Sequence, residues 1–231
     1  MSRALNASGK DLRTVSAELK ERIVGGQVTV RNAHRLGGLC AGLKSGRITV
    51  EGDSGDYLGV LNAGAIIEVE GNAGRYLADN MTSGAVSVKG NAGEGAGAYC
   101  YGGTIVVKGN AGDFAAVMNK GATVIVAGNA GDDVATYMLA GDVVIVGNAG
   151  RNLGNYLIRG NIYVGGEWQS LGHNTRLEEM TAADDSKLRS WLSEYGIEAD
   201  PSRFRKIVRL SEKPFYKEAK TPKTESSRAK P

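Results

Sequence analysis

Apolar and small residues recur along the middle of the chain with a period of 19 residues. The tetrapeptide Gly-Asn-Ala-Gly begins at Gly71 and recurs four times at this spacing, and a looser Gly-Asp-Ser-Gly begins at Gly52. We number each repeat from its first glycine, which is position 0. Positions 15 and 17 hold only β-branched residues: Ile67 and Val69, Val86 and Val88, Ile105 and Val107, Val124 and Val126, Val143 and Ile145, Ile162 and Val164. Apolar residues two apart indicate a β-strand with one buried face, so each repeat predicts one strand.

A second inward-facing column is predicted at position 6. It holds Leu58, Leu77, Ala96, Ala115, Val134 and Leu153. A unit of this length cannot bury a core alone and must stack on its neighbours. The Leu-x-x-Leu-x-Leu pattern of leucine-rich repeats is absent. The sequence therefore predicts a mainly β protein, a parallel β-helix of about seven 19-residue coils over residues 28–166.

The glycines at positions 0 and 3 are predicted to form the corners of the coils. Glycine reaches positive φ without steric cost, and Asn or Asp between the glycines can hydrogen-bond locally and stack in a ladder. These corner glycines are Gly71, Gly74, Gly90, Gly93, Gly109, Gly112, Gly128, Gly131, Gly147 and Gly150.

Short helices are predicted to cap both ends of the coils. Residues 11–23 carry apolar side chains at helical spacing before two glycines, so residues 1–27 form an N-terminal cap. Residues 167–216 contain a capping box from Thr181 to Asp184, an apolar helical face, and a short strand or arm over 204–210. Residues 217–231 are polar and are predicted to be a flexible tail.

The outward face of the predicted strand changes along the chain. Position 16 holds Glu68 and Ser87 in the early coils but turns apolar in the later ones. We call the later residues at positions 16 and 18 the apolar stripe: Val106, Ile125, Val144, Tyr163, Ala127 and Val146. Because a contiguous exposed apolar patch marks an interaction surface, either the C-terminal helix folds over the stripe or a partner subunit docks there. The partner interface is our working hypothesis.

Charge and composition exclude several functional classes. The formal net charge of +3 equals the surplus of the last fifteen residues, so the body has no basic stripe of the kind that binds nucleic acid. The sequence contains neither a secretion-signal pattern nor a run of about 18 apolar residues that would span a membrane. Two cysteines outside any paired motif fit a reducing compartment. We expect a cytoplasmic protein.

The two cysteines are predicted to be unpaired. Aligning Leu36 with Leu58 places Cys40 at position 10, the column of Cys100, but three coils away. Strands lie about 4.8 Å apart, which gives a separation of about 14 Å, and a disulfide needs Cα atoms within about 7 Å. Both thiols are therefore expected to be buried small hydrophobes.

Histidine and acidic residues offer only weak candidate sites. His34 and His173 are the two histidines and fall near opposite ends of the coils, so they cannot share a metal or a nucleophile. Asp113 and Asp132 are neighbours at position 4, with Asp133 beside them, and could hold a cation. A solvated corner is the favoured interpretation because charged side chains are mostly exposed.

Three runs of sequence resemble one known family. Residues 31–38 (Arg-Asn-Ala-His-Arg-Leu-Gly-Gly), residues 50–59 (Val-Glu-Gly-Asp-Ser-Gly-Asp-Tyr-Leu-Gly) and the Gly-Asn-Ala-Gly series are similar to the glycine-repeat (GXGXG) family. This family includes the C-terminal domain of the glutamate synthase large subunit, one of the subunits of formylmethanofuran dehydrogenase, and free-standing subunits of glutamate-synthase-like complexes. The flanking helices make the chain most similar to the free-standing subunits of the N-methylglutamate synthase type (methylamine–glutamate N-methyltransferase).

The resemblance implies a right-handed β-helix that acts as the structural subunit of an enzyme complex. A glutamine-amidotransferase-like subunit and an FMN and iron–sulfur subunit would be its partners and would carry the reactive groups. No cluster-type cysteine set, flavin phosphate site or cysteine after Met1 is present, so no catalytic, cofactor or metal residue is assigned to this chain. The alternatives are a structural subunit of formylmethanofuran dehydrogenase or of an ammonia-dependent glutamate synthase, and, in another class, a stand-alone β-helix that binds or cleaves polysaccharide.

Overall fold

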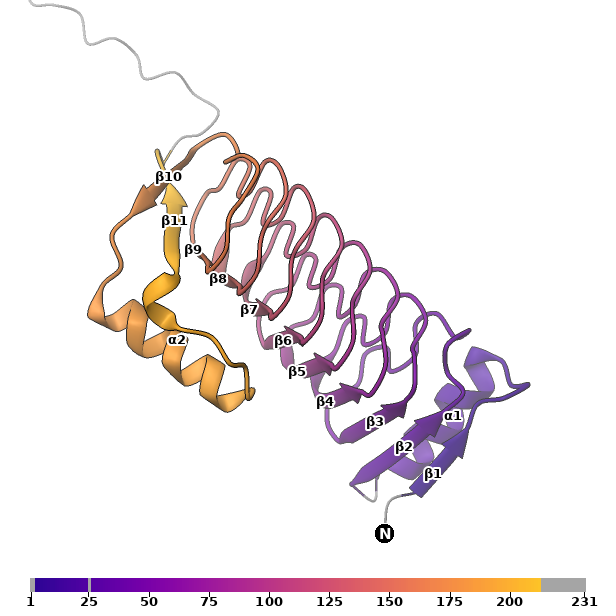
Figure 1. Cartoon of the computed structure of the whole chain (residues 1–231). Helices are drawn as coiled ribbons and strands as arrows, with labels where there is room; N and C mark the ends of the chain where they lie inside the picture. The colour runs from indigo at the N-terminus through magenta and orange to yellow at the C-terminus, as the bar shows by residue number, and fades with distance from the viewer. Residues whose placement is uncertain (1–2, 25, 213–231) are drawn as a thin grey trace, which may run out of the picture.

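The computed structural model describes residues 3–24 and 26–212. Within them, the chain is a parallel β-helix in which each coil adds one strand to a single long sheet (Figure 1). The strands of the coils are β2 (Gln27–Arg31), β3 (Arg47–Glu51), β4 (Ala63–Val69), β5 (Ser83–Val88), β6 (Thr104–Val107), β7 (Lys120–Val126), β8 (Ala140–Ile145) and β9 (Asn161–Val164). The predicted tail, residues 217–231, lies outside the described residues.

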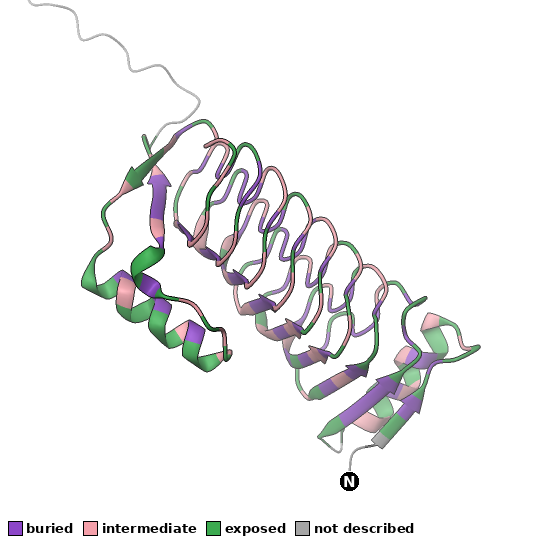
Figure 2. Cartoon of the chain, in the orientation of Figure 1, coloured by how far each residue is buried: buried purple, intermediate pink, exposed green. Residues whose placement is uncertain are grey.

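Pairing between coils follows the 19-residue period. Ile67 pairs with Val86, Val86 with Ile105, and the same step continues to Ile162. All side chains at positions 15 and 17 from Ile67 onward are buried, and so are those at position 6. The predicted fold class and its inward-facing columns are confirmed. Burial is concentrated along this continuous interior (Figure 2).

A ladder of asparagine side chains joins the corners of successive coils. The backbone N–H of Asn91 donates to Oδ1 of Asn72, and the same bond recurs at every step from Asp53 to Glu167 with lengths of 2.7 to 2.9 Å. Each side chain thus satisfies a backbone donor of the coil above. The predicted ladder at this corner is confirmed.

The reason for glycine at the corners differs from the predicted one. None of the ten corner glycines has a positive φ. Instead, a Cβ at Gly90 would lie 2.4 Å from Oδ1 of Asn72, and one at Gly131 would lie 2.1 Å from Oδ1 of Asp113. The glycines are needed because the side chain and backbone of the previous coil come too close for any Cβ. Positive φ occurs farther along each coil, at positions 5, 7 and 9, as at Tyr57 and Tyr99.

The N-terminal end is closed by α1 (Leu12–Ile23), which confirms the predicted cap. Its Asp11 N-cap accepts a 2.7 Å hydrogen bond from the Thr14 N–H, and Val15 and Leu19 are buried. The strand β1 (Arg3–Asn6) precedes it and pairs in parallel with β2. Four residues carry too little periodicity to predict such a strand.

The C-terminal end combines a helix with two antiparallel strands. The helix α2 (Ala182–Glu194) begins with the predicted capping box between Thr181 and Asp184. A 3-10 turn η1 (Pro201–Arg203) leads to β11 (Arg205–Arg209), which pairs antiparallel with β9 and with β10 (Thr175–Glu178). The corner column also continues past Gly166, because Trp168 bridges to Ala149.

The alignment of the first coil was wrong by three residues. The Gly59 N–H donates to the Leu39 carbonyl, as the Ala78 N–H does to that of Leu58. Leu39, not Leu36, therefore occupies position 6, and Cys40 occupies position 7 rather than the column of Cys100. Both cysteines are buried and free. The error arose because this shortened coil lacks the Gly-Asn-Ala-Gly marker.

Substitution of a corner glycine tests whether close approach explains these residues. We expect Gly109→Ala to destabilise the protein by about 2–3 kcal/mol, because its Cβ would overlap Oδ1 of Asn91 at 2.4 Å. Gly42→Ala is the control, since Gly42 has φ +63 but open space around the new Cβ, which should cost about 1 kcal/mol. Urea unfolding midpoints measure both. A larger loss for Gly42→Ala would contradict the close-approach explanation.

Ser54 offers a stabilising substitution. It stands at position 2, where the next five coils have alanine, and its buried Oγ has no hydrogen-bond partner among the described residues. We expect Ser54→Ala to stabilise the protein by about 1 kcal/mol, because an unpaired hydroxyl no longer loses its hydration on folding. The reverse change, Ala111→Ser, should destabilise it. Unfolding midpoints that move the other way would contradict the expectation.

Candidate interaction surface

The apolar stripe is covered by the chain itself. Val106, Ile125, Val144 and Tyr163 are each at most 1% exposed and form a second core cluster with residues of the C-terminal region. Ala127 and Val146 are half-buried. Of the two alternatives for the stripe, folding of the C-terminal helix over it is correct. The partner-interface hypothesis for these six residues is corrected, because α2 occupies the face that a partner would need.

The packing of α2 follows from its apolar spacing. Leu188 and Leu192 lie one helical turn apart on the buried face and contact the stripe, and Phe204 completes the cluster. The Trp191 ring meets the Tyr163 ring edge-on at 6.5 Å between centroids. This helix lies beside the strands of the later coils in Figure 1.

A buried polar network connects α2 to the β-helix and to β11. The Tyr163 hydroxyl donates to Oδ1 of Asp184 at 2.6 Å, and Nζ of Lys206 lies 3.1 Å from Oδ2 of Asp184. Thr181 donates to the same carboxylate through its N–H and its hydroxyl, and Lys206 also pairs with Glu178. Burial alone would raise the pKa of Asp184, but the hydrogen bonds from Thr181, Tyr163 and Lys206 hold this pKa well below its usual range. The carboxylate is therefore a charged structural centre.

The candidate nucleophiles and acids take structural roles. Burial raises the pKa of Cys40 and of Cys100 to about 12, so both thiols are protonated at neutral pH. Oδ1 of Asp113 accepts the Asp132 N–H, and Oδ1 of Asp132 accepts the Arg151 N–H. These position 4 carboxylates form a second ladder between coils. Across the described residues, no group of three or more His, Cys, Asp or Glu side chains could hold a metal ion.

The two histidines lie apart, at the two ends predicted for them. His34 lines a small hollow of about 300 Å³ at the N-terminal end, next to Lys10 and Arg35. His173 lies on the last coil, where its ring is tilted against the Tyr156 ring at 4.9 Å between centroids.

An uncovered aromatic surface lies on the turn side of the coils. Positions 9 and 11 of four successive coils supply it, and we call it the aromatic ridge: Tyr99, Tyr101, Met118, Lys120, Tyr137, Leu139, Tyr156 and Ile158. Tyr101 is 56% exposed, and Tyr99, Tyr137 and Leu139 are each 36–38% exposed. The remaining four are half-buried. Large apolar side chains gathered on an exposed face indicate an interaction surface.

Lys120 is the one charged residue within the ridge. Its Nζ forms no ion pair with a carboxylate of the described residues but donates to the Tyr101 hydroxyl at 2.8 Å. The same ammonium lies 4.1 Å from the Tyr101 ring centroid and 5.9 Å from that of Tyr99. Cation–π contacts thus hold the charge at the surface between two rings.

The columns of the ridge escaped the sequence analysis because they are not uniform. The coil that begins at Gly71 has Asn80 and Thr82 at positions 9 and 11, which interrupts the apolar character before Tyr99. The concentration of four of the nine tyrosines in these two columns was the signal available. Residues two apart share a face only in an extended strand, whereas position 9 has a positive φ, so the strand period does not mark positions 9 and 11 as neighbours.

Two pairs of tyrosines stack along the axis of the β-helix, and one of these pairs belongs to the ridge. The rings of Tyr57 and Tyr76 are stacked at 5.0 Å, and those of Tyr137 and Tyr156 at 5.2 Å. Gly95 leaves the space on the far side of Tyr76, since its Cβ would lie 2.6 Å from that ring. Stacked rings use one face of each ring on the other. This differs from the free ring faces on which sugars stack.

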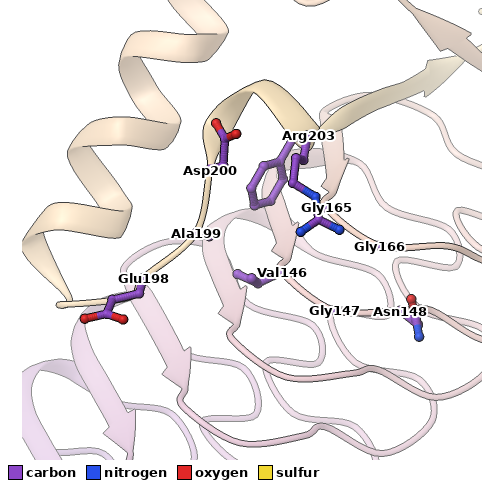
Figure 3. A pocket seen from close by; sticks show the side chains of 10 residues that line it. Val146, Gly147, Asn148, Gly165, Gly166, Glu198, Ala199, Asp200 and Arg203 are labelled. Carbon is purple, nitrogen blue, oxygen red and sulfur yellow. The ribbon is translucent and has the colours of Figure 1, made fainter.

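A smaller cleft of about 230 Å³ separates η1 from the last corners (Figure 3). Arg203 points its guanidinium toward the backbone of Gly165, whereas Glu198 points away from it (Figure 3). Asp200 accepts hydrogen bonds from the N–H and hydroxyl of Ser202 and so caps the 3-10 turn. The polar groups of the cleft do not converge on one point.

No helix among the described residues combines the length and the apolar character that crossing a membrane requires. Fold and surface together define a class: a parallel β-helix with self-capped ends and an uncovered aromatic ridge. The model of the family described as GXGXG motif matches residues 2–198, and the chain belongs to this family. No curated protein matches the chain.

Protonation of Asp184 should release α2 in acid. Because the folded-state pKa lies below the ordinary value of 3.8, the carboxylate stabilises the docked helix above about pH 4, and this stabilisation is lost as the pH falls further. We expect Asp184→Asn to lower the free energy of unfolding by about 3 kcal/mol at pH 7. The variant should also lose less stability than the wild type as the pH falls below 4. Trp191 fluorescence and urea midpoints report both effects.

Asp185→Asn serves as the matched control, because Asp185 pairs with Arg189 on the exposed side of the same helix. It should leave the unfolding midpoint nearly unchanged. Equal effects of the two substitutions would contradict a specific role for the buried network.

Proposed function

We propose that this chain is a non-catalytic structural subunit of a glutamate-synthase-like enzyme complex. The observation that carries the proposal is the aromatic ridge, an apolar surface on a rigid stack of coils that the chain leaves uncovered. Membership of the GXGXG family supports it, since this family includes the β-helical domain of glutamate synthase. The protein would hold an amidotransferase-like subunit and an FMN and iron–sulfur subunit in a fixed relation.

The particular complex we propose is N-methylglutamate synthase, the methylamine–glutamate N-methyltransferase. Support comes from the arrangement of the chain, in which a β-helix stands between its own caps, α1 at one end and α2 with β10 and β11 at the other. FMN and iron–sulfur clusters would lie on a partner subunit. The Asp113, Asp132, Cys40 and Cys100 side chains serve packing and corner bonds, and we assign the chemistry to the partners.

The corner carboxylates and the stacked tyrosine rings also favour this proposal over a polysaccharide enzyme. The position 4 carboxylates of Asp113 and Asp132 accept backbone N–H groups of the next coil, which is a structural role. The rings of Tyr137 and Tyr156 stack on each other. A sugar ring would need such a face to be free.

Reconstitution tests the proposal. The chain is expressed with the amidotransferase-like and FMN/iron–sulfur subunits from the same organism and purified through a tag on this chain. We expect a complex of all three proteins that forms N-methylglutamate from methylamine and glutamate, and no activity from this chain alone. Failure of the chain to bind either subunit, or product formation by the isolated chain, would overturn the proposal. Ammonia in place of methylamine as the better substrate would assign the complex to the glutamate synthase type instead.

A further inference from the structure

We propose that the aromatic ridge docks a partner protein that brings carboxylates to Lys120 and Arg159. The identity of that partner rests on the proposed function, since it would be one of the two catalytic subunits named above. The chemistry that the partner must offer follows from the ridge itself.

The composition of the ridge is that of an interface core. Aromatic side chains and methionine are enriched in such cores, whereas acidic side chains are depleted. The ridge has four tyrosines and one methionine, and none of its residues is acidic. Four coils at about 4.8 Å give it a length of about 14 Å between the first and the last, which suits the central cluster of a larger interface.

Lys120 presents a cation that is held in place and forms no direct ion pair with a described residue. An ammonium has three donors, and one of them is used on the Tyr101 hydroxyl. The nearby Asp79 carboxylate interacts electrostatically with Lys120 but forms no ion pair with it, and its Oδ2 accepts from the Asn80 side chain. A carboxylate arriving from outside would find donors of Lys120 available.

Arg159 adds a second positive charge at the end of the ridge. It follows Ile158, is exposed, and forms no ion pair with a described residue, whereas its neighbours Arg176 and Arg209 pair with Glu178 and Glu212. Lys120 and Arg159 together outnumber the single nearby carboxylate of Asp79, so these three groups leave a net positive charge. Charge complementarity favours an acidic partner surface and disfavours a basic one.

A second copy of the chain fits this surface poorly. In a two-fold dimer each residue near the axis meets its own copy, so a ridge-to-ridge contact would place Lys120 near the other Lys120. The ridge residues supply no carboxylate to offset that repulsion. An isologous dimer at the ridge is thus electrostatically unfavourable.

Membranes and sugars fit less well for separate reasons. Binding to an anionic membrane through basic residues takes clusters of about four to eight Lys or Arg, and the ridge with the adjoining Arg159 offers two cations. A glycan stacks on free ring faces, but Tyr137 and Tyr156 cover one another and Lys120 lies over the Tyr101 ring. A protein surface with apolar side chains and carboxylates is the partner that matches both the apolar side chains of the ridge and its cations.

Binding measurements on the purified wild-type chain and its purified partner subunits test this inference. We expect Lys120→Glu and Tyr101→Ala each to raise the Kd for one partner about 30-fold, the change typical of a hot spot. Lys89→Glu is the matched control, since Lys89 is an exposed lysine that pairs with Glu70 away from the ridge. It should change the Kd less than about twofold. Circular dichroism and the unfolding midpoint verify that each variant is folded, and Lys120→Gln gives a milder test if the glutamate variant is not.

Photo-crosslinking identifies the occupant directly. A benzoylphenylalanine at position 139 replaces Leu139 in the assembled complex, and the crosslinked peptide is mapped by mass spectrometry. We expect a partner peptide containing Asp or Glu, and substitution of that acid by lysine should restore binding to Lys120→Glu. Crosslinks to a second copy, or unchanged affinity in both ridge variants while the complex still forms, would overturn the docking inference alone. Absence of any complex with the wild-type chain would instead refute the proposed function.

Discussion

The structure depends on one repeated interaction, the hydrogen bond from a backbone N–H at each corner to the asparagine side chain of the coil before it. This bond joins residues 19 apart and recurs from Asp53 to Glu167. It forms only because the corner glycines leave space for the side-chain oxygen. Since every coil is bonded to its neighbour in the same way, an insertion inside a coil would break two sets of bonds at once. The strict 19-residue period is therefore required for the apolar positions of successive coils to lie one above another.

Two faces of the same stack of coils differ in whether the chain covers them. The strand face of the later coils is apolar at position 16 and is covered by α2, with Asp184 fixing the contact to Tyr163 and Lys206. The turn side carries the aromatic ridge and remains uncovered by any described residue of the chain. The C-terminal region buries the apolar stripe within the chain itself. The uncovered ridge is the face on which we propose that a partner docks.

What the sequence predicted well rests on local or strictly periodic signals. The β-branched pairs such as Ile67 and Val69 fix the strands, and Thr181 with Asp184 fixes the start of α2. The explanation for the corner glycines was wrong because close approach between coils is a three-dimensional property, whereas positive φ is the usual local reason for glycine. Cys40 was misplaced because its coil lacks the marker. The aromatic ridge was missed because Tyr99 and Tyr101 become neighbours of Lys120 only after the coils stack.

The positive φ values of the turn segments have a consequence for how the ridge can bind. Tyr99 and Tyr137 sit at φ 57 and 55, a conformation that costs an L-residue about 1 kcal/mol and persists only because the neighbouring coils hold the backbone there. The entropic cost of fixing this backbone is met during folding rather than on binding. A surface of this kind is preorganised, because the stacked coils fix its shape. Its affinity for a partner would therefore depend on the stability of coils that do not contact the partner.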